Sequence, residues 1–156
     1  MTATISSILL PTRFSVLSRR AAEYVRVLAP RLDARVHIVN VVPHTELIVD
    51  PGMAGVSMPV FGPSERELVE RAQDKLAAFA SEVLPDLAAR ITVCALFGGV
   101  RDGLVKYAAD NAVDLVVMGT HADGMLKRAI FGSVGKSVLE HSPCPVLLVP
   151  VHGAPR

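Results

Sequence analysis

Hydrophobic residues follow two alternating patterns along the chain, one typical of buried strands and the other of helices with one buried face. Short apolar runs predict five strands, and these are Ile5–Pro11, Val36–Val42, Ile91–Phe97, Leu115–Met118 and Val146–Val149. Between the runs, apolar residues return every three or four positions, as they do on one face of a helix. One such set is Leu68, Ala72, Leu76, Phe79 and Val83. The pattern therefore predicts four helices that alternate with the five strands.

This alternation predicts an α/β fold in which helices cover both faces of a parallel sheet. The predicted strands are apolar over most of their length, as strands buried on both faces are. Because crossovers are right-handed and a doubly wound sheet reverses its direction once, we expect a doubly wound five-stranded parallel sheet in the order 3-2-1-4-5. A chain of 156 residues suits one domain, so we expect a single domain over residues 1–156.

Serine residues stand where three of the helices are expected to begin. Ser15 and Ser133 can cap the first and last helices, and Ser64 forms a capping box with Glu67 three positions later. The segment 44–63 has no helical period and is rich in proline and glycine. We therefore expect a long, mobile surface loop over 44–63.

The predicted strand order directs attention to one end of the sheet. In doubly wound sheets, ligands bind at the carboxyl ends of the strands on either side of the point where the order reverses. Here those ends are the tripeptides Pro11-Thr12-Arg13 and Gly119-Thr120-His121, which follow the first and fourth predicted strands. We expect a binding site between them, where His121 is either a ligand contact or a hydrogen-bonding loop residue.

A glycine-rich segment leads from Gly119 to the last predicted helix at Ser133. A helix N-terminus offers unpaired backbone N–H groups and the positive end of the helix dipole. Gly132 would let an anion approach the backbone closely, and Ser133 can either cap the helix or donate its hydroxyl to a phosphate. Lys127 and Arg128 add positive charge nearby. The segment predicts an anion-binding loop, and a simple turn with a helix cap is the alternative.

The overall charge is close to balanced, which limits the classes of partner. The chain has 16 basic and 15 acidic residues and a net charge of +1, which is too small to attract nucleic acid or an anionic membrane. No run approaches the roughly 20 apolar residues that cross a bilayer, and the first residues lack the pattern of a signal peptide. We therefore expect a cytoplasmic protein that binds neither nucleic acid nor membrane.

Residues that could catalyse a reaction or hold a metal do not come together in the predicted fold. The five histidines have no partner at metal-ligand spacing, and Cys94 and Cys144 are expected to be buried, unreactive thiols. The glycine patterns of a P-loop and of a dinucleotide fold are absent. A phosphoaccepting receiver needs carboxylates where this chain has Arg13 and Phe97-Gly98. We expect a protein with no catalytic residues and no metal, and weak nucleotide hydrolysis stays open.

The carboxyl-terminal part of the chain carries a recognisable succession of motifs. These are Val117-Met118-Gly119-Thr120-His121, Leu126-Lys127-Arg128, Gly132-Ser133-Val134 and His141-Ser142-Pro143-Cys144-Pro145-Val146-Leu147-Leu148-Val149. Together with the opening segment Ile8–Ser15, they resemble the universal stress protein family over essentially the whole chain. The resemblance implies a flavodoxin-like architecture similar to that of adenine nucleotide alpha hydrolases. It also implies a stress-response role and an adenine nucleotide such as ATP as the ligand.

Nucleotide-binding members of that family carry the pattern Gly-x2-Gly-x9-Gly-Ser/Thr. Matched residue by residue, the resemblance implies that phosphates and ribose are held by Gly119, Ala122, Gly132, Ser133 and Val134. It also implies that the base is surrounded by Thr12, Arg13 and the backbone near Val41, with Pro11 and Met118 at the two strand ends.

Three positions depart from the family pattern. Ala122 replaces the second glycine, Asp123 stands where the family often has a basic residue, and Arg13 stands where ATP-binding members usually have an acidic one. An arginine only donates hydrogen bonds, so Arg13 cannot accept them from a nucleoside, but it can clamp a phosphate or another anion. Two functions therefore stay open. One is the binding of an adenine nucleotide or another anion, and the other is a nucleotide-free dimeric interaction module.

The last predicted strand, Val146–Val149, would form an edge of the sheet and is too apolar to be left uncovered. Pairing with the same strand of a second chain would cover it, and the family resemblance also implies homodimers. The alternative is that Val151, His152 and the tail fold back over this strand.

Overall fold

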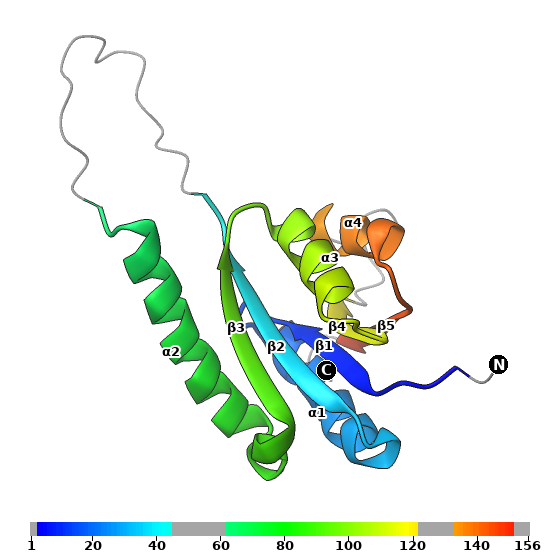
Figure 1. Ribbon diagram of the computed structural model, residues 1–156. Helices are drawn as coiled ribbons and strands as arrows, with labels where there is room; N and C mark the ends of the chain where they lie inside the picture. Colours follow the sequence, from blue (N-terminus) through cyan, green and yellow to red (C-terminus); the bar gives the residue numbers. More distant parts are fainter. Residues whose placement is uncertain (1–2, 45–61, 122–132, 152–156) are drawn as a thin grey trace, which may run out of the picture.

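The chain folds as an alternation of strands and helices around one sheet (Figure 1). The computed structural model describes residues 3–44, 62–121 and 133–151. Its strands are β1 Ser7–Pro11, β2 Arg35–Val42, β3 Ile91–Phe97, β4 Leu115–His121 and β5 Val146–Val151. Its helices are α1 Val16–Leu32, α2 Glu65–Val83, the 3-10 helix η2 Pro85–Arg90, α3 Val100–Asp110 and α4 Ser133–His141.

The sheet is parallel throughout and has the order β3-β2-β1-β4-β5, which confirms the predicted fold class. Its middle strand, β1, pairs with β2 on one side and with β4 on the other, so that Leu9 lies between His37 and Val116. The order reverses at β1, because the chain proceeds outward to β2 and β3 and then returns to β4 and β5. The carboxyl ends of β1 and β4 therefore lie at the reversal point.

Alternate residues of β1 point into two separate halves of the core. Ile8 and Leu10 are fully buried in the half that α1 and α2 cover. Leu9 is 1% exposed and belongs to the other half, where it packs in one cluster with Leu104 of α3 and Val138 of α4. Helices thus cover both faces of the sheet, as the alternation of strands and helices predicted.

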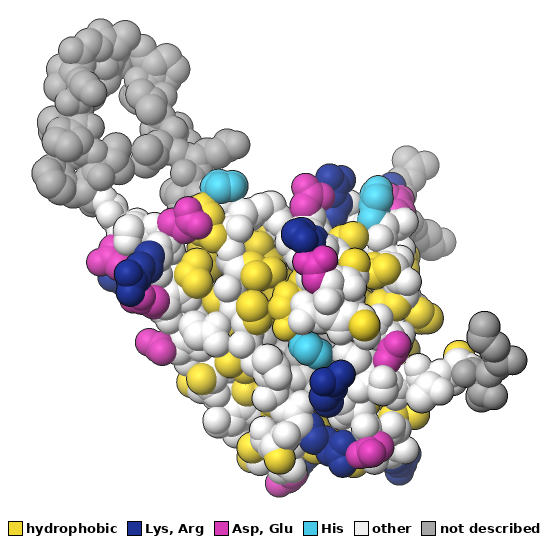
Figure 2. Space-filling view, in the orientation of Figure 1, with side chains coloured by type: hydrophobic (Ala, Val, Ile, Leu, Met, Phe, Trp, Pro, Cys, Tyr) yellow, Lys and Arg dark blue, Asp and Glu magenta, His cyan; other side chains and the backbone are white. Residues whose placement is uncertain are grey.

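The face of β3 on the α3 side is less completely covered than the centre of the sheet. Cys94 and Leu96 are half-buried there, whereas Val39 on the neighbouring strand has no exposed surface. Figure 2 shows hydrophobic side chains gathered over this part of the molecule. None of the helices in the described ranges is long and apolar enough to cross a membrane.

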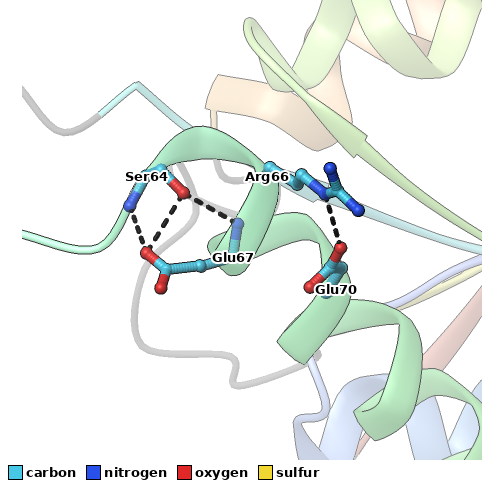
Figure 3. A network of polar contacts seen from close by, with 4 residues as sticks. All are labelled: Ser64, Arg66, Glu67 and Glu70. Atoms are coloured by element: carbon cyan, nitrogen blue, oxygen red, sulfur yellow. Dashed lines mark hydrogen bonds and ion pairs between the residues drawn. The ribbon is translucent and has the colours of Figure 1, made fainter.

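The capping box at the start of α2 is confirmed (Figure 3). The backbone N–H of Ser64 donates to Glu67 Oε2 over 2.7 Å, and the N–H of Glu67 donates to Ser64 Oγ over 3.3 Å. The backbone hydrogen bond from Ser64 is the main reason why the pKa of Glu67 is lowered. One turn along, Arg66 Nε donates to Glu70 Oε1 over 2.8 Å. The two bonds between Ser64 and Glu67 satisfy backbone N–H groups that a helix start leaves unpaired, so they locate the first turn of α2.

Several predicted boundaries were wrong by a few residues. β1 begins at Ser7 instead of Ile5, β5 continues to Val151, and the helix η2 was not predicted. Ser15 occupies the capping position of α1, but its hydroxyl makes no capping hydrogen bond. Ser133 already lies in α4, and the residues before it lie outside the described part of the chain.

β4 is three residues longer than predicted and includes Gly119, Thr120 and His121. These residues stay in the sheet because β5 continues beside them, with Gly119 opposite Val149 and His121 opposite Val151. The tripeptide therefore ends the strand instead of following it. Most of the predicted loop 44–63 lies outside the described residues.

Candidate functional site

A cavity of about 190 Å³ lies at the carboxyl ends of β1, β2 and β4. The turn that follows β1 forms one wall, through Thr12, Arg13 and Ser15. Residues 118–120 of β4 form the opposite wall. This is the crevice that the strand order predicts for a ligand, because it opens where the order of the strands reverses.

Gly119 determines how closely β4 and α1 approach each other. A Cβ atom at this position would lie 2.1 Å from the carbonyl oxygen of Leu17 and 2.9 Å from its Cα. No side chain fits at these distances, and the obstacle is backbone, which cannot rotate away. Glycine is therefore required here to bring the end of β4 against the first turn of α1, which closes the base of the cavity.

The turn between β1 and α1 is held by hydrogen bonds from buried groups. The N–H of Thr12 donates to Val39 O, and Asn40 Nδ2 donates to Thr12 O, each over 2.8 Å. The N–H of Phe14 donates to Thr12 Oγ1 over 2.9 Å. Phe14 has a φ of 59°, which is uncommon for a residue other than glycine. Because Thr12 and Asn40 are both buried, this turn is anchored in the sheet before any ligand binds.

Hydroxyl groups follow the turn into α1. Ser18 is buried, and its Oγ accepts the backbone N–H of Arg13 over 3.3 Å. Ser15 Oγ lies 3.4 Å from Ser18 Oγ. Ser15, Ser18 and Thr12 all line the cavity, and Thr120 lines it from β4. The cavity thus offers hydrogen-bonding groups that are neutral and fixed in place.

The charge at the described lining of the cavity is positive. Arg13 is the one charged residue among those that line it within the described part of the chain, and no aspartate or glutamate lines it there. The Arg13 side chain is exposed and forms no ion pair with the described residues. A guanidinium in this position favours an anionic group at the mouth of the cavity.

The remaining wall is apolar. It is formed by Val39 and Val41 of β2 together with Val100 and Leu104 of α3. Gly103 has no side chain, and this lets α3 lie close to β2. A Cβ atom at this position would lie only 3.3 Å from Val41 Cγ2. Apolar walls with a few fixed polar groups are typical of sites for small organic ligands.

Eight of the residues that the sequence placed at the site line this cavity, and they are Pro11, Thr12, Arg13, Val41, Met118, Gly119, Thr120 and Val134. Ser133 is exposed and does not line the cavity. Ala122 and Gly132 lie outside the described residues, as does the side chain of His121.

Sequence reasoning missed lining residues on five elements, which are α1, β2, α3, α4 and β5. Leu17 and Ser18 lie in the first turn of α1, and Val39 lies two positions before Val41 on β2. The period of two along a strand already placed Val39 on the same face as Val41. Leu148 of β5 lines the cavity because it pairs beside Met118 of β4, and the sequence did not predict this register.

A second polar cluster lies away from the cavity. His37 Nδ1 and Tyr107 Oη are 2.9 Å apart, and the two rings meet edge to face. Burial lowers the pKa of His37, with a further contribution from Arg35, and burial raises the pKa of the Cys94 thiol. A raised thiol pKa is typical of an unreactive cysteine. No group of three potential metal ligands occurs among the residues that the structure describes.

Comparison with protein families gives one family model, described as the universal stress protein family, which matches residues 4–150. Universal stress protein MJ0577 of Methanocaldococcus jannaschii is 28% identical over 158 residues, covering 96% of this chain and 97% of the relative. Universal stress protein MJ0531 of the same organism is 30% identical over 144 residues, covering 91% of this chain and 80% of the relative.

Solved structures share the fold. The structure of MJ0577 superposes with a TM-score of 0.71 at 27% identity and covers 95% of this chain and 97% of its own. A universal stress protein in complex with cAMP has a TM-score of 0.58 at 22% identity, covering 94% and 97% of the two chains. The universal stress protein from Archaeoglobus fulgidus in complex with dAMP has a TM-score of 0.63 at 17% identity, covering 95% and 99%.

Proposed function

Since this chain belongs to the universal stress protein family, we propose that it binds an adenine nucleotide, or another small anion, in the crevice between β1 and β4 without catalysing a reaction. The observation that carries the proposal is the cavity itself. It lies at the reversal point of the sheet, has an apolar wall for a planar ring, and has Arg13 as the charged group of its described lining. Two structurally similar proteins were solved with cAMP and dAMP, which supports an adenine nucleotide as the ligand class.

The size of the cavity indicates which part of such a ligand it encloses and which part stays outside. Its volume of about 190 Å³ is below the range of about 300–1,000 Å³ that is common for sites enclosing a whole drug-sized ligand. We expect the base to enter between β2 and α3, against Val41 and Leu104. The phosphate would then remain at the mouth, near the guanidinium of Arg13.

The lack of catalysis rests on the chemistry of the described lining. Among the described lining residues, Arg13 is the one with an ionisable side chain. Arginine stays protonated and cannot act as a general base. Release of inorganic phosphate from ATP at a sustained rate above the buffer control would contradict this part of the proposal.

Binding is tested by calorimetry with AMP, ADP, ATP, cAMP and inorganic phosphate, together with mass spectrometry of the protein as purified. We expect saturable binding of at least one adenine nucleotide, and weaker binding by Arg13→Ala. Arg20→Ala is the matched control, because Arg20 is also exposed but pairs with Glu23 and does not line the cavity. No binding of any of these ligands at millimolar concentration would overturn the proposal.

The second candidate is a nucleotide-free dimeric interaction module. It is favoured by Arg13, which replaces the acidic residue usual in ATP-binding members, and by the half-buried leucines of the outer strand β5. An Arg13→Asp, Ala122→Gly double variant that gains nucleotide affinity over a wild type that has none would favour this candidate. Ala122 itself lies outside the described residues.

Dimerisation through Val146–Val149 is part of both candidates. A charge at Leu148 would disturb the cavity as well, because Leu148 lines it. Leu147 is half-buried at the margin of the core on the α1 side and does not line the cavity, so Leu147→Lys leaves the cavity lining unchanged. We expect a dimer for the wild type and a monomer for Leu147→Lys in sedimentation, with an unchanged circular dichroism spectrum. Equal masses would contradict dimerisation through this strand.

A further inference from the structure

The side chain of Gln73 on α2 reaches the backbone of the outer strand β3. Its Nε2 donates to Val93 O over 3.0 Å, and its Oε1 accepts the N–H of Ala95 over 2.8 Å. Gln73 is half-buried, so the amide is held against the sheet instead of extending into solvent. A single side chain therefore pairs with both a donor and an acceptor of β3.

These two backbone groups point away from the sheet. The N–H of Gly98 donates to Val42 O of β2, which sets the direction of even-numbered residues at this end of β3. Because the backbone groups of successive residues in a parallel strand alternate in direction, odd-numbered residues face the opposite way. Val93 and Ala95 thus belong to the outer edge, since β3 is the last strand on its side of the sheet among the described residues.

The pattern is the one that a further strand would use. In a parallel ladder, one residue of the added strand donates its N–H to residue i−1 and accepts the N–H of residue i+1. Here the positions i−1 and i+1 are Val93 and Ala95, on either side of Cys94. The carboxamide of Gln73 has the same donor and acceptor as a peptide group, and it takes both places at once.

The opposite edge of the sheet differs. β5 is the last strand on the other side, and no side chain in the described ranges is recorded with a comparable pair of hydrogen bonds to it. An unprotected edge can add a strand of another chain, whereas a blocked edge cannot. If both edges were available, copies of the chain could continue to add to one another and form open-ended assemblies.

We propose that Gln73 closes the β3 edge by occupying the hydrogen-bonding positions of an added strand, so that copies of this chain associate only through β5. The occupant that Gln73 excludes is an edge strand of a second copy. The inference concerns association and does not depend on whether the crevice binds a nucleotide.

The experiment compares two substitutions at Gln73 by sedimentation over a wide range of protein concentration. Gln73→Ala removes both hydrogen bonds and opens the edge, so we expect species larger than the wild type that grow with concentration. Gln73→Glu keeps an acceptor for the N–H of Ala95 and adds a charge that opposes strand pairing. We expect Gln73→Glu to keep the mass of the wild type.

Amide hydrogen exchange measured by NMR gives an independent readout. In the wild type, the amide of Ala95 should exchange at least about tenfold more slowly than the amide of Val93, which faces the same edge without a comparable bond. Gln73→Ala should remove this difference. If the Gln73→Ala variant does not fold, the wild-type exchange rates still decide.

Two results would overturn the proposal. One is a wild-type Ala95 amide that exchanges as fast as that of Val93. The other is a folded Gln73→Ala variant whose mass equals that of the wild type at every concentration.

Discussion

The two ends of strand β1 use their polar groups in different ways. At the amino end, the carboxylate of Asp114 accepts hydrogen bonds from the N–H and the Oγ of Ser6 and from the N–H of Ser7, over 2.8, 2.9 and 3.0 Å. At the carboxyl end, Thr12 is fixed by the sheet, but Arg13 beside it has no charged partner among the described residues and faces a cavity.

The difference separates stability from binding. At the amino end, the carboxylate of Asp114 stabilises the fold, because its hydrogen bonds are made within the chain. At the carboxyl end, the turn is held in place by buried groups while the side chain that carries the charge is left available. Substitutions at the two ends should therefore act on different measurements, except at Gly119, where the shape of the cavity and the packing of the fold are the same feature.

The largest effect is expected for Gly119→Ala. The new Cβ would overlap the backbone of Leu17, so the variant should lose about 3 kcal/mol of unfolding free energy and its ligand binding as well. Urea denaturation measures the loss. The control is Gly103→Ala in α3. Its Cβ would meet only side chains, the nearest being that of Val41 at 3.3 Å, so this variant should change the unfolding free energy by less than about 1 kcal/mol. A Gly119→Ala variant as stable as the wild type would show that β4 and α1 are not so closely packed.

Asp114→Asn should lower stability at neutral pH by about 1 kcal/mol, the usual difference between charged and neutral hydrogen bonds, reduced by partial exposure. Nucleotide affinity should not change. The hydrogen bonds from Ser6 lower the pKa of Asp114 in the folded protein. Its stabilisation is therefore present above the ordinary aspartate pKa and lost as the pH falls through the lowered folded value. Wild type and variant should converge in stability once the pH lies below the lowered folded pKa, and a difference that stays constant as the pH falls would contradict the assignment.

Arg13→Ala should do the opposite of Asp114→Asn, lowering ligand affinity and leaving stability unchanged. It should weaken nucleotide or phosphate binding about tenfold, equivalent to about 1.4 kcal/mol, because a guanidinium–phosphate contact is lost. Its melting temperature without ligand should equal that of the wild type, since Arg13 makes no ion pair with the described residues. Calorimetry and thermal melting on the same sample separate the two effects. A lower melting temperature with unchanged affinity would reverse the roles that we assign to the two ends.

The smallest effect on stability is expected at His37 of β2, which pairs with Leu9 in the middle of β1. Burial is the main reason why its folded pKa lies below the ordinary value of 6.5. The unfolded chain then binds the proton more readily, so stability should fall by under about 1 kcal/mol as the pH drops from 6.5 through the lowered folded value. His37→Gln should remove this slope when unfolding is followed between pH 7.5 and pH 5. An unchanged slope would assign it to another group.

The fold could be predicted because its signals are local and repeated. The apolar runs and the helical spacings gave the order of elements, and the rules for parallel sheets then gave the strand order that is observed. The boundaries were less accurate where neighbours decide them. β4 continues through Gly119 because β5 pairs beside it, and no pattern within the segment itself reveals that partner.

The candidate site could be predicted only at its two strand ends. Thr12 and Gly119 follow from the reversal of the strand order, whereas Ser18 contributes through a contact between a helix and a turn that has no sequence signature. The close approach of Gly119 to Leu17 is a further example, because a glycine in a sequence does not reveal what its absent side chain would meet.

The central claim is that a ligand binds at the carboxyl end of β1 and not at its amino end. An NMR titration of the isotope-labelled protein with AMP, followed through the backbone amides, tests it directly. We predict saturable shifts for Thr12, Arg13 and Gly119, and unchanged signals for Ser7 and Asp114. Shifts centred on Ser7 and Asp114, or no shifts up to millimolar AMP, ADP and ATP, would contradict it.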